Sequence, residues 1–251
     1  SDLARVSGIE DGEEETVLDL GIKAGMNKGV MANFDLAAGT QNRYAGRIFG
    51  GVMQNNMKLF LMTNANNTND MGFPGGGGGG RFGAGRQGLT ANKMVGVNLN
   101  YENTDKFKLD GSIRWNHSDG DVLSKGNSKN FINEQNSQYR NSLSHNFSCS
   151  NSWNGQMRLE WQPDSMTNIM FRPNFSYTTN DGINKSEDAS FDKNPFDYSD
   201  DPLTDVFDIA KKYGIAQNYS VQSGTTYSDS KNLRGMLQFN RRLSNNGRNI
   251  T

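Results

Sequence analysis

A ten-residue stretch, Asn168 to Tyr177, alternates between apolar and polar side chains. Its odd-numbered positions from Ile169 onward are all apolar, whereas its even-numbered positions are polar except for Met170. Because successive side chains of a β-strand point to opposite faces of a sheet, the stretch predicts a strand with one apolar and one polar face. Two architectures use such a strand. In a soluble sandwich the apolar face packs on a second sheet, and in a membrane barrel it meets lipid while the polar face lines water.

The composition excludes several other classes of protein. The 251 residues carry a formal net charge of -1, so no basic excess marks the chain for nucleic acid. Only 33% of the residues are hydrophobic, but 29 glycines and 10% aromatics set in alternating runs favour a folded β protein over a disordered chain. No apolar run reaches the roughly 18 residues of a transmembrane helix, and the first residues lack the pattern of a signal peptide. A membrane-spanning β-strand needs only about ten residues, so a barrel remains possible.

The same alternation recurs along the chain and predicts about eight strands. The expected strands are residues 30–38, 44–52, 58–65, 95–101, 107–116, 153–161, 168–177 and 233–240. After the first hairpin, short turns are expected to alternate with long connections at 66–88, 117–146 and 178–230. Outer-membrane barrels have this asymmetry, with tight turns at one end and long extracellular loops at the other, whereas a sandwich rarely contains a connection of about 50 residues.

Aromatic residues are expected at both ends of the apolar faces. The first group, at the end with the short turns, is Tyr101, Phe107 and Trp161; the second group, at the opposite end, is Trp115, Trp153 and Tyr177. Such positions are typical of the two aromatic girdles that face lipid at the membrane interfaces of a barrel. The alternative is that the same residues form the ordinary core of a secreted β-sandwich.

No catalytic or metal-binding motif with a defensible spacing is present in the sequence. The glycine run 75–80 lacks both the Lys-Ser/Thr of a phosphate-binding loop and the following helix of a dinucleotide site, so it predicts a flexible loop. His117 and His145 lie in polar segments expected to be loops, and the single Cys149 is predicted to be inert. The aspartates between residues 192 and 201 do not have the spacing of a calcium loop, which favours solvated carboxylates. We therefore expect no enzyme, no cofactor and no metal.

A short helix is predicted within the longest connection, from Pro202 to Tyr213. Asp201 is expected to cap its N-terminus and Gly214 its C-terminus, since a carboxylate can accept from free backbone N–H groups and glycine readily ends a helix. We expect this helix to fold over the mouth of the barrel.

Several segments together resemble a known family. They are Glu14 to Leu20 leading into Lys28 and Gly29, Asn64 to Phe73 with the glycine run and the strand up to Tyr101, and Leu159 to Met166. These segments are similar to those of the TonB-dependent-receptor-like outer-membrane β-barrel proteins of Gram-negative bacteria. The resemblance implies an all-β, antiparallel up-and-down transmembrane barrel in the cell outer membrane. Residues 1–26 would be the end of a plug region, and residues 27–251 the N-terminal portion of a barrel that usually has about 22 strands. The chain would then be a fragment of a longer protein.

Two functional hypotheses follow. The resemblance implies uptake of a nutrient through a plugged barrel, with TonB acting through a segment outside this chain. The alternative is a structural platform for surface lipoproteins or for other subunits of an outer-membrane complex; outer-membrane lipid is a partner in both. The charged residues expected to face the lumen are Lys108, Asp110, Arg114, Arg158, Glu160, Arg172 and Arg234. They either line a ligand pathway or form a polar wall in which cross-strand pairs, such as Asp110 with Arg114, neutralise one another.

Overall fold

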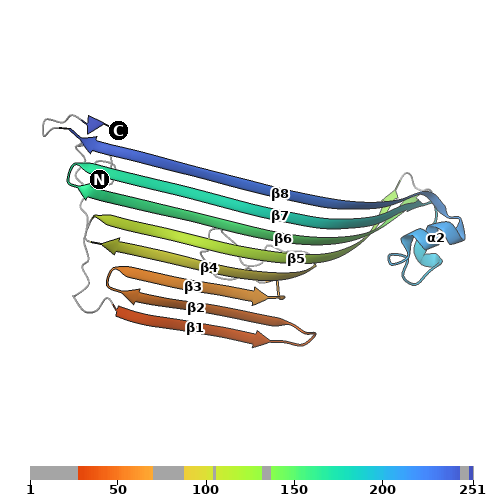
Figure 1. Ribbon diagram of the computed structural model, residues 1–251. Coiled ribbons are helices and arrows are strands. Elements are labelled where there is room, and N and C mark those ends of the chain that lie inside the picture. Colours follow the sequence, from red (N-terminus) through yellow and green to blue (C-terminus); the bar gives the residue numbers. More distant parts are fainter. Residues whose placement is uncertain (1–27, 70–87, 104–105, 132–136, 244–248, 251) are drawn as a thin grey trace.

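The strands form a single antiparallel sheet in which each strand pairs with the next one along the chain (Figure 1). The computed structural model describes residues 28–69, 88–103, 106–131, 137–243 and 249–250. Residues 1–26, predicted to end a plug region, lie outside this part. Eight long strands are followed by β9 (Asn249–Ile250), a two-residue strand that pairs with the end of the eighth. The all-β, up-and-down prediction is confirmed, but the described residues form an open sheet.

The strands differ greatly in length. The first four are β1 (Lys28–Ala38), β2 (Tyr44–Gln54), β3 (Met57–Asn66) and β4 (Leu89–Asn103). The next four are β5 (Phe107–Phe131), β6 (Ser137–Asp164), β7 (Thr167–Phe191) and β8 (Ala216–Arg242), with 25, 28, 25 and 27 residues respectively. At about 3.3 Å per residue these four reach more than twice the length of the roughly ten residues that cross a bilayer.

Two of the connections predicted to be long loops are strand instead. Over residues 117–146 the sequence predicts a polar loop, but β5 and β6 stay paired up to Phe131 and Ser137. Over residues 178–230 it predicts another loop, but β7 and β8 stay paired up to Phe191 and Ala216, so only residues 192–215 connect them. The prediction was wrong because these halves of the strands carry polar residues on both faces, which removes the apolar alternation while leaving the backbone free to pair.

The asparagine-rich segment after β3 holds neighbouring turns in place. Asn67 accepts a hydrogen bond from the backbone N–H of Tyr44 (2.8 Å) and donates one to the carbonyl of Asn42 (2.9 Å). Asn69 donates to the carbonyl of Gly88 (2.8 Å), whose φ of 80° is readily adopted only by glycine. These bonds fix both ends of the connection between β3 and β4; its residues 70–87, which include the glycine run, lie outside the described residues.

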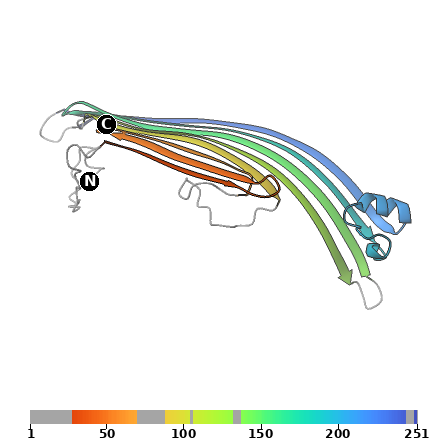
Figure 2. The ribbon, with the colours of Figure 1, turned by 90° about the horizontal axis from the view of Figure 1, so that it is seen from below.

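The two faces of the sheet differ in chemistry. We call outward the face formed by odd-numbered residues of β3 to β8 and by even-numbered residues of β1 and β2, and we call the opposite face inward. Large apolar side chains are exposed on the outward face of all eight long strands, for example Phe34, Val52, Leu61, Val95, Ile113, Trp153, Phe171 and Leu237. The apolar face that the sequence predicts for β7 lies on this outward face, where Phe171, Phe175 and Tyr177 are between 37% and 40% exposed. The described strands form a single curved layer, so no second sheet covers this face as a sandwich would require (Figure 2).

The connection between β7 and β8, residues 192–215, folds into a compact excursion. It contains the short helix η1 (Pro195–Asp197) and the helix α2 (Val206–Tyr213). Val206, Ile209 and Ala210 from α2 pack against Ala189 and Phe191 at the end of β7 in a buried cluster. Because Ala189 and Phe191 are odd-numbered, the excursion lies on the outward face (Figure 2). The predicted position over the mouth of a barrel stays a prediction, since the described residues form an open sheet.

The helix α2 begins later than the sequence predicts. Its N-cap is Asp205, whereas the carboxylate of Asp201 accepts from the backbone N–H of Leu203 (3.2 Å) and from the Thr204 hydroxyl, which closes the preceding turn. The Asp201 carboxylate also pairs with Lys125 of β5 at 3.2 Å, which ties the excursion to the sheet. The predicted C-cap is confirmed, since Gly214 has the left-handed φ of 59° that ends a helix.

The contacts of Asp201 predict that the docking of the excursion depends on pH. Hydrogen bonds from Thr204 and Lys125 lower the pKa of the Asp201 carboxyl group. A carboxylate whose pKa is lowered by folding stabilises the fold above its ordinary pKa and loses this contribution as the pH falls through the lowered value. We expect pepsin to cleave residues 192–215 faster as the pH is lowered through this range, and Asp201→Asn to flatten the dependence. An Asp201→Asn variant with the pH profile of the unmodified protein would contradict this.

Candidate functional site: the polar inward face

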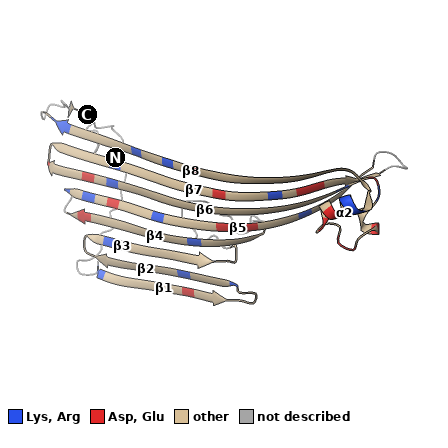
Figure 3. Cartoon of the chain, turned by 45° about the vertical axis from the view of Figure 1, so that its right-hand side comes forward, with Lys and Arg blue, Asp and Glu red and all other residues tan. Residues whose placement is uncertain are grey.

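The seven charged residues predicted to face a lumen all lie on the inward face. They are even-numbered residues of β5 (Lys108, Asp110, Arg114), β6 (Arg158, Glu160), β7 (Arg172) and β8 (Arg234). Five of the seven are basic and two are acidic, and the charged positions of the sheet are spread over its strands (Figure 3). A face of this kind is wetted and offers ion-pair and hydrogen-bond partners to a polar solute.

Two of these residues are held by β4. The ammonium of Lys108 lies 2.6 Å from the carboxylate of Glu102, its register partner. Asp110, expected to pair with Arg114, instead accepts a hydrogen bond from the side chain of Asn100, which is its own register partner. Asn100 lies directly across from Asp110 on the neighbouring strand, whereas Arg114 lies four residues further along the same strand.

Glu160 is the most buried of the seven, with 2% of its area exposed. Its carboxylate accepts hydrogen bonds from Arg158 (3.3 Å) and from the side-chain amide of Asn168 (3.2 Å). A buried charge is tolerated only with such partners. Glu160 therefore contributes to the structure of the wall and is not available to a solute.

Two grooves cross the inward face. The first, of about 690 Å³, is lined mainly by Asn98, Asn100, Asp110, Arg158, Arg172 and Asn174; the second, of about 770 Å³, is lined mainly by Arg114, Asn116, Asn154, Asn232 and Arg234. Arg114, Arg172 and Arg234 have no carboxylate partner among the described residues. A guanidinium group binds carboxylate and phosphate oxygens through paired N–H donors, and side-chain amides bind hydroxyl groups. The grooves are thus suited to a polar, anionic solute.

The six predicted girdle aromatics lie in two rows on the outward face. In the first row the rings of Tyr101 and Phe107 meet edge to face at 6.1 Å, and Trp161 is the register partner of Phe107. In the second row Trp115 lies 6.3 Å from Trp153, whose other register partner is Tyr177. On β5 the rows are eight residues apart, which corresponds to about 26 Å and matches the roughly 25 Å apolar band of membrane barrels.

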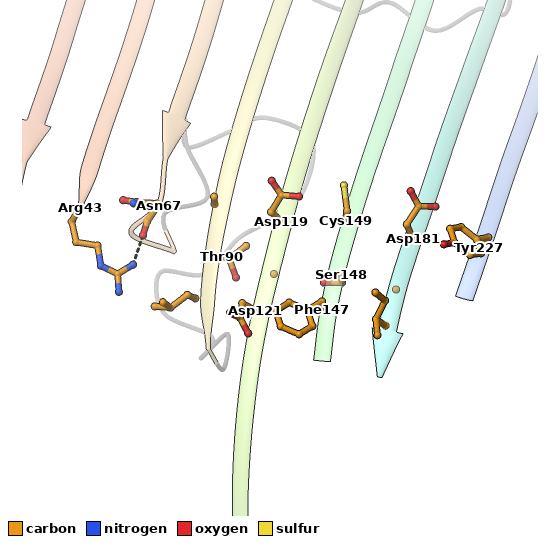
Figure 4. A pocket seen from close by; sticks show the side chains of 15 residues that line it. Arg43, Asn67, Thr90, Asp119, Asp121, Phe147, Ser148, Cys149, Asp181 and Tyr227 are labelled. Atoms are coloured by element: carbon orange, nitrogen blue, oxygen red, sulfur yellow. Dashed lines mark hydrogen bonds between the residues drawn. The ribbon is translucent and has the colours of Figure 1, made fainter. Parts of the chain in front are cut away.

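Sequence reasoning missed a cluster just beyond the second row of aromatics. Nε2 of His117 lies 2.7 Å from the carboxylate of Asp119, and Cys149 is the register partner of Asp119 on β6. Both residues line a hollow of about 540 Å³ on the outward face together with Asp121, Phe147 and Asp181 (Figure 4). Only the register of β5 against β6 joins residues so far apart in the sequence, and the predicted loop over 117–146 hid that register.

Comparison with known proteins adds no family assignment. The sequence matches no protein-family model, and no curated protein is significantly similar to it. No helix in the described part of the chain is both long and apolar enough to cross a membrane.

Proposed function

We propose that this chain forms part of the wall of an outer-membrane β-barrel that takes up a nutrient in a TonB-dependent manner. The observation that carries the proposal is the uncovered apolar band of the outward face, bounded by the two aromatic rows and opposed by a polar inward face. Soluble proteins rarely expose contiguous apolar patches larger than a few hundred Å². Lipid would cover the band and water would meet the inward face.

The edges of the sheet support a larger assembly. The described part of the sheet ends at β1 on one side, and on the other β8 pairs with β9 only at Arg241 and Arg242. Unpaired backbone N–H and C=O groups find no water in the hydrocarbon core of a membrane and cost several kcal/mol each. The proposal therefore requires that both edges of the sheet be paired, by further strands or by closure of the sheet, when the protein is in lipid.

The inward grooves indicate which solutes the wall would guide. Arg172 and Arg234 line different grooves and have no carboxylate partner among the described residues. Such arginines attract carboxylate or phosphate groups, and the neighbouring asparagines bind hydroxyl groups. We infer that the nutrient is polar and anionic.

Uptake by cells tests this proposal. A deletion strain should lose TonB-dependent uptake of at least one labelled nutrient from a panel of anionic and neutral solutes, and the unmodified protein should restore it. The double variant Arg172→Gln/Arg234→Gln should restore at least about tenfold less, since each hydrogen bond to a charged group contributes about 1.5–3 kcal/mol. Lys231→Gln, which removes an exposed outward charge, is the matched control. A protein found in the soluble fraction would overturn the proposal.

A structural platform is the second candidate function. The length of β5 to β8 favours it, because more than half of each strand continues past the roughly ten residues needed to cross the bilayer. These extensions carry the excursion and could hold a surface lipoprotein. In this case the deletion would leave uptake of every solute unchanged and would instead release a protein that copurifies with the barrel.

A further inference from the structure

We propose that His117, Asp119 and Cys149 form a binding site for a transition-metal ion of the zinc class on the outward face, beyond the second aromatic row. An imidazole, a carboxylate and a thiolate are all ligands that Zn²⁺ accepts, and three protein ligands with a fourth, open position are common at zinc sites. This site is separate from the inward grooves and does not depend on uptake.

The geometry of the three side chains is close to that of a bound site. One ligand atom from each residue lies within 4.8 Å of the other two. Two ligands of one tetrahedral zinc ion, at about 2.0–2.3 Å from the metal, are themselves about 3.3–3.8 Å apart. Small rotations of the side chains would therefore bring all three atoms onto one ion. The His117 ring also stacks on Trp115, with ring centroids 5.9 Å apart.

Asn151 orients the imidazole toward the metal position. Nδ1 of His117 lies 2.8 Å from Oδ1 of Asn151, which can only accept, so Nδ1 carries the proton. In the neutral ring Nε2 then presents a lone pair to the Asp119 carboxylate 2.7 Å away. At this distance the two atoms share a proton in a hydrogen bond, which a metal ion would replace after the two atoms separate to about 3.3 Å. A second hydrogen-bonding partner of this kind is typical of histidines that bind metals.

The charges around the site favour a cation. Asp181 on β7 is the other register partner of Cys149, so Asp119 and Asp181 flank the thiol, and Asp121 lines the same hollow further along β5 (Figure 4). Lys93 on β4 is the register partner of His117 and supplies the opposing positive charge. The hollow leaves the fourth metal position open to water.

Binding must displace a proton from the thiol. Burial and the hydrogen bond to Asp119 raise the pKa of Cys149. The metal accepts lone pairs from the imidazole, the carboxylate and the resulting thiolate, and about one proton passes to the solvent, so affinity should increase with pH.

A second histidine pair provides an internal control. Nε2 of His145 lies 2.7 Å from the carboxylate of Asp121, the same separation as in the proposed site. The register partner of Asp121 is Phe147, so a thiol is lacking there. A His–Asp pair alone should bind far more weakly than the cluster with Cys149.

Titration of the full chain in detergent with Co²⁺, followed by competition with Zn²⁺, tests the proposal. We expect one Co²⁺ per chain, a thiolate-to-cobalt charge-transfer band in the near ultraviolet, and loss of the band when Zn²⁺ is added. Cys149→Ser should abolish the band and His117→Gln should weaken binding at least tenfold, while His145→Gln should leave it unchanged. Equal affinities for His117→Gln and His145→Gln would overturn the proposal.

Alkylation of the unmodified protein gives a readout that needs no substitution. Zn²⁺ should slow the reaction of Cys149 with iodoacetamide severalfold, and a chelator should restore the rate. An alkylation rate that does not respond to Zn²⁺ would count against the site even if a variant failed to fold.

Discussion

The substitution Phe171→Arg is expected to prevent insertion into the outer membrane or to reduce the stability of the inserted protein by about 2–4 kcal/mol, the cost of an arginine on the lipid face near the bilayer midplane. Phe171 lies on the outward face between the two aromatic rows, and its register partner is Leu237, which is 71% exposed. The guanidinium group would enter hydrocarbon with no described carboxylate on the neighbouring outward positions to neutralise it. Leu237→Arg should behave in the same way.

The adjacent residue supplies the control. Arg172 lies one position further along β7 and faces inward, so Arg172→Gln replaces one hydrated group with another and should cost little. Heat-modifiable mobility of the full-length protein on gels, which reports the folded barrel, measures both variants. Equal sensitivity at residues 171 and 172 would contradict the assignment of the two faces and, with it, the membrane proposal.

The parts of the strands that the sequence predicts correctly are those with an apolar face. In β7, alternation from Ile169 to Tyr177 is enough to define the strand and both faces. Beyond Tyr177 the same strand continues, but its side chains are mostly polar until the buried cluster at Ala189 and Phe191. Ser150 donates to the side chain of Asn180 (2.8 Å) and Asn184 donates to Asn146 (2.5 Å), which are ladder contacts between polar residues. A search for alternating apolar and polar residues cannot detect a strand of this kind, because both of its faces are polar.

The sequence pattern predicts the candidate sites only in part as well. The face of each charged residue follows from the parity of its position, so the inward charges could be named from the sequence. Their partners do not follow from parity: Asp110 contacts Asn100 across the strands, whereas Arg158 contacts Glu160 along its own strand. The metal cluster depends on register entirely, since 30 positions separate Asp119 from Cys149 in the numbering although the two residues are directly paired.

A substitution in the buried cluster under α2 is expected to have the second large effect, on the docking of residues 192–215. Phe191 is fully buried (0% exposed) at the end of β7, where it contacts the helix of the excursion. Replacing a buried phenylalanine by alanine typically costs about 3–5 kcal/mol through lost burial and a residual cavity. We expect Phe191→Ala to undock residues 192–215, with faster proteolysis within this segment and faster hydrogen exchange of the α2 amides. Phe196→Ala, which truncates a phenylalanine of the same excursion that is 46% exposed, should change neither rate measurably.

The position of the excursion determines whether its undocking can affect insertion into the membrane. Phe191 lies 14 residues beyond Tyr177 of the second aromatic row, which places the cluster outside the proposed membrane band. Undocking should therefore leave heat-modifiable mobility unchanged, in contrast to Phe171→Arg, because the apolar surface that lipid covers is not altered. If Phe191→Ala instead abolished insertion, folding of the extensions would be coupled to folding of the barrel wall, and the excursion could not be an independently docked unit. Unchanged insertion together with loss of a copurifying surface protein would favour the platform function over uptake.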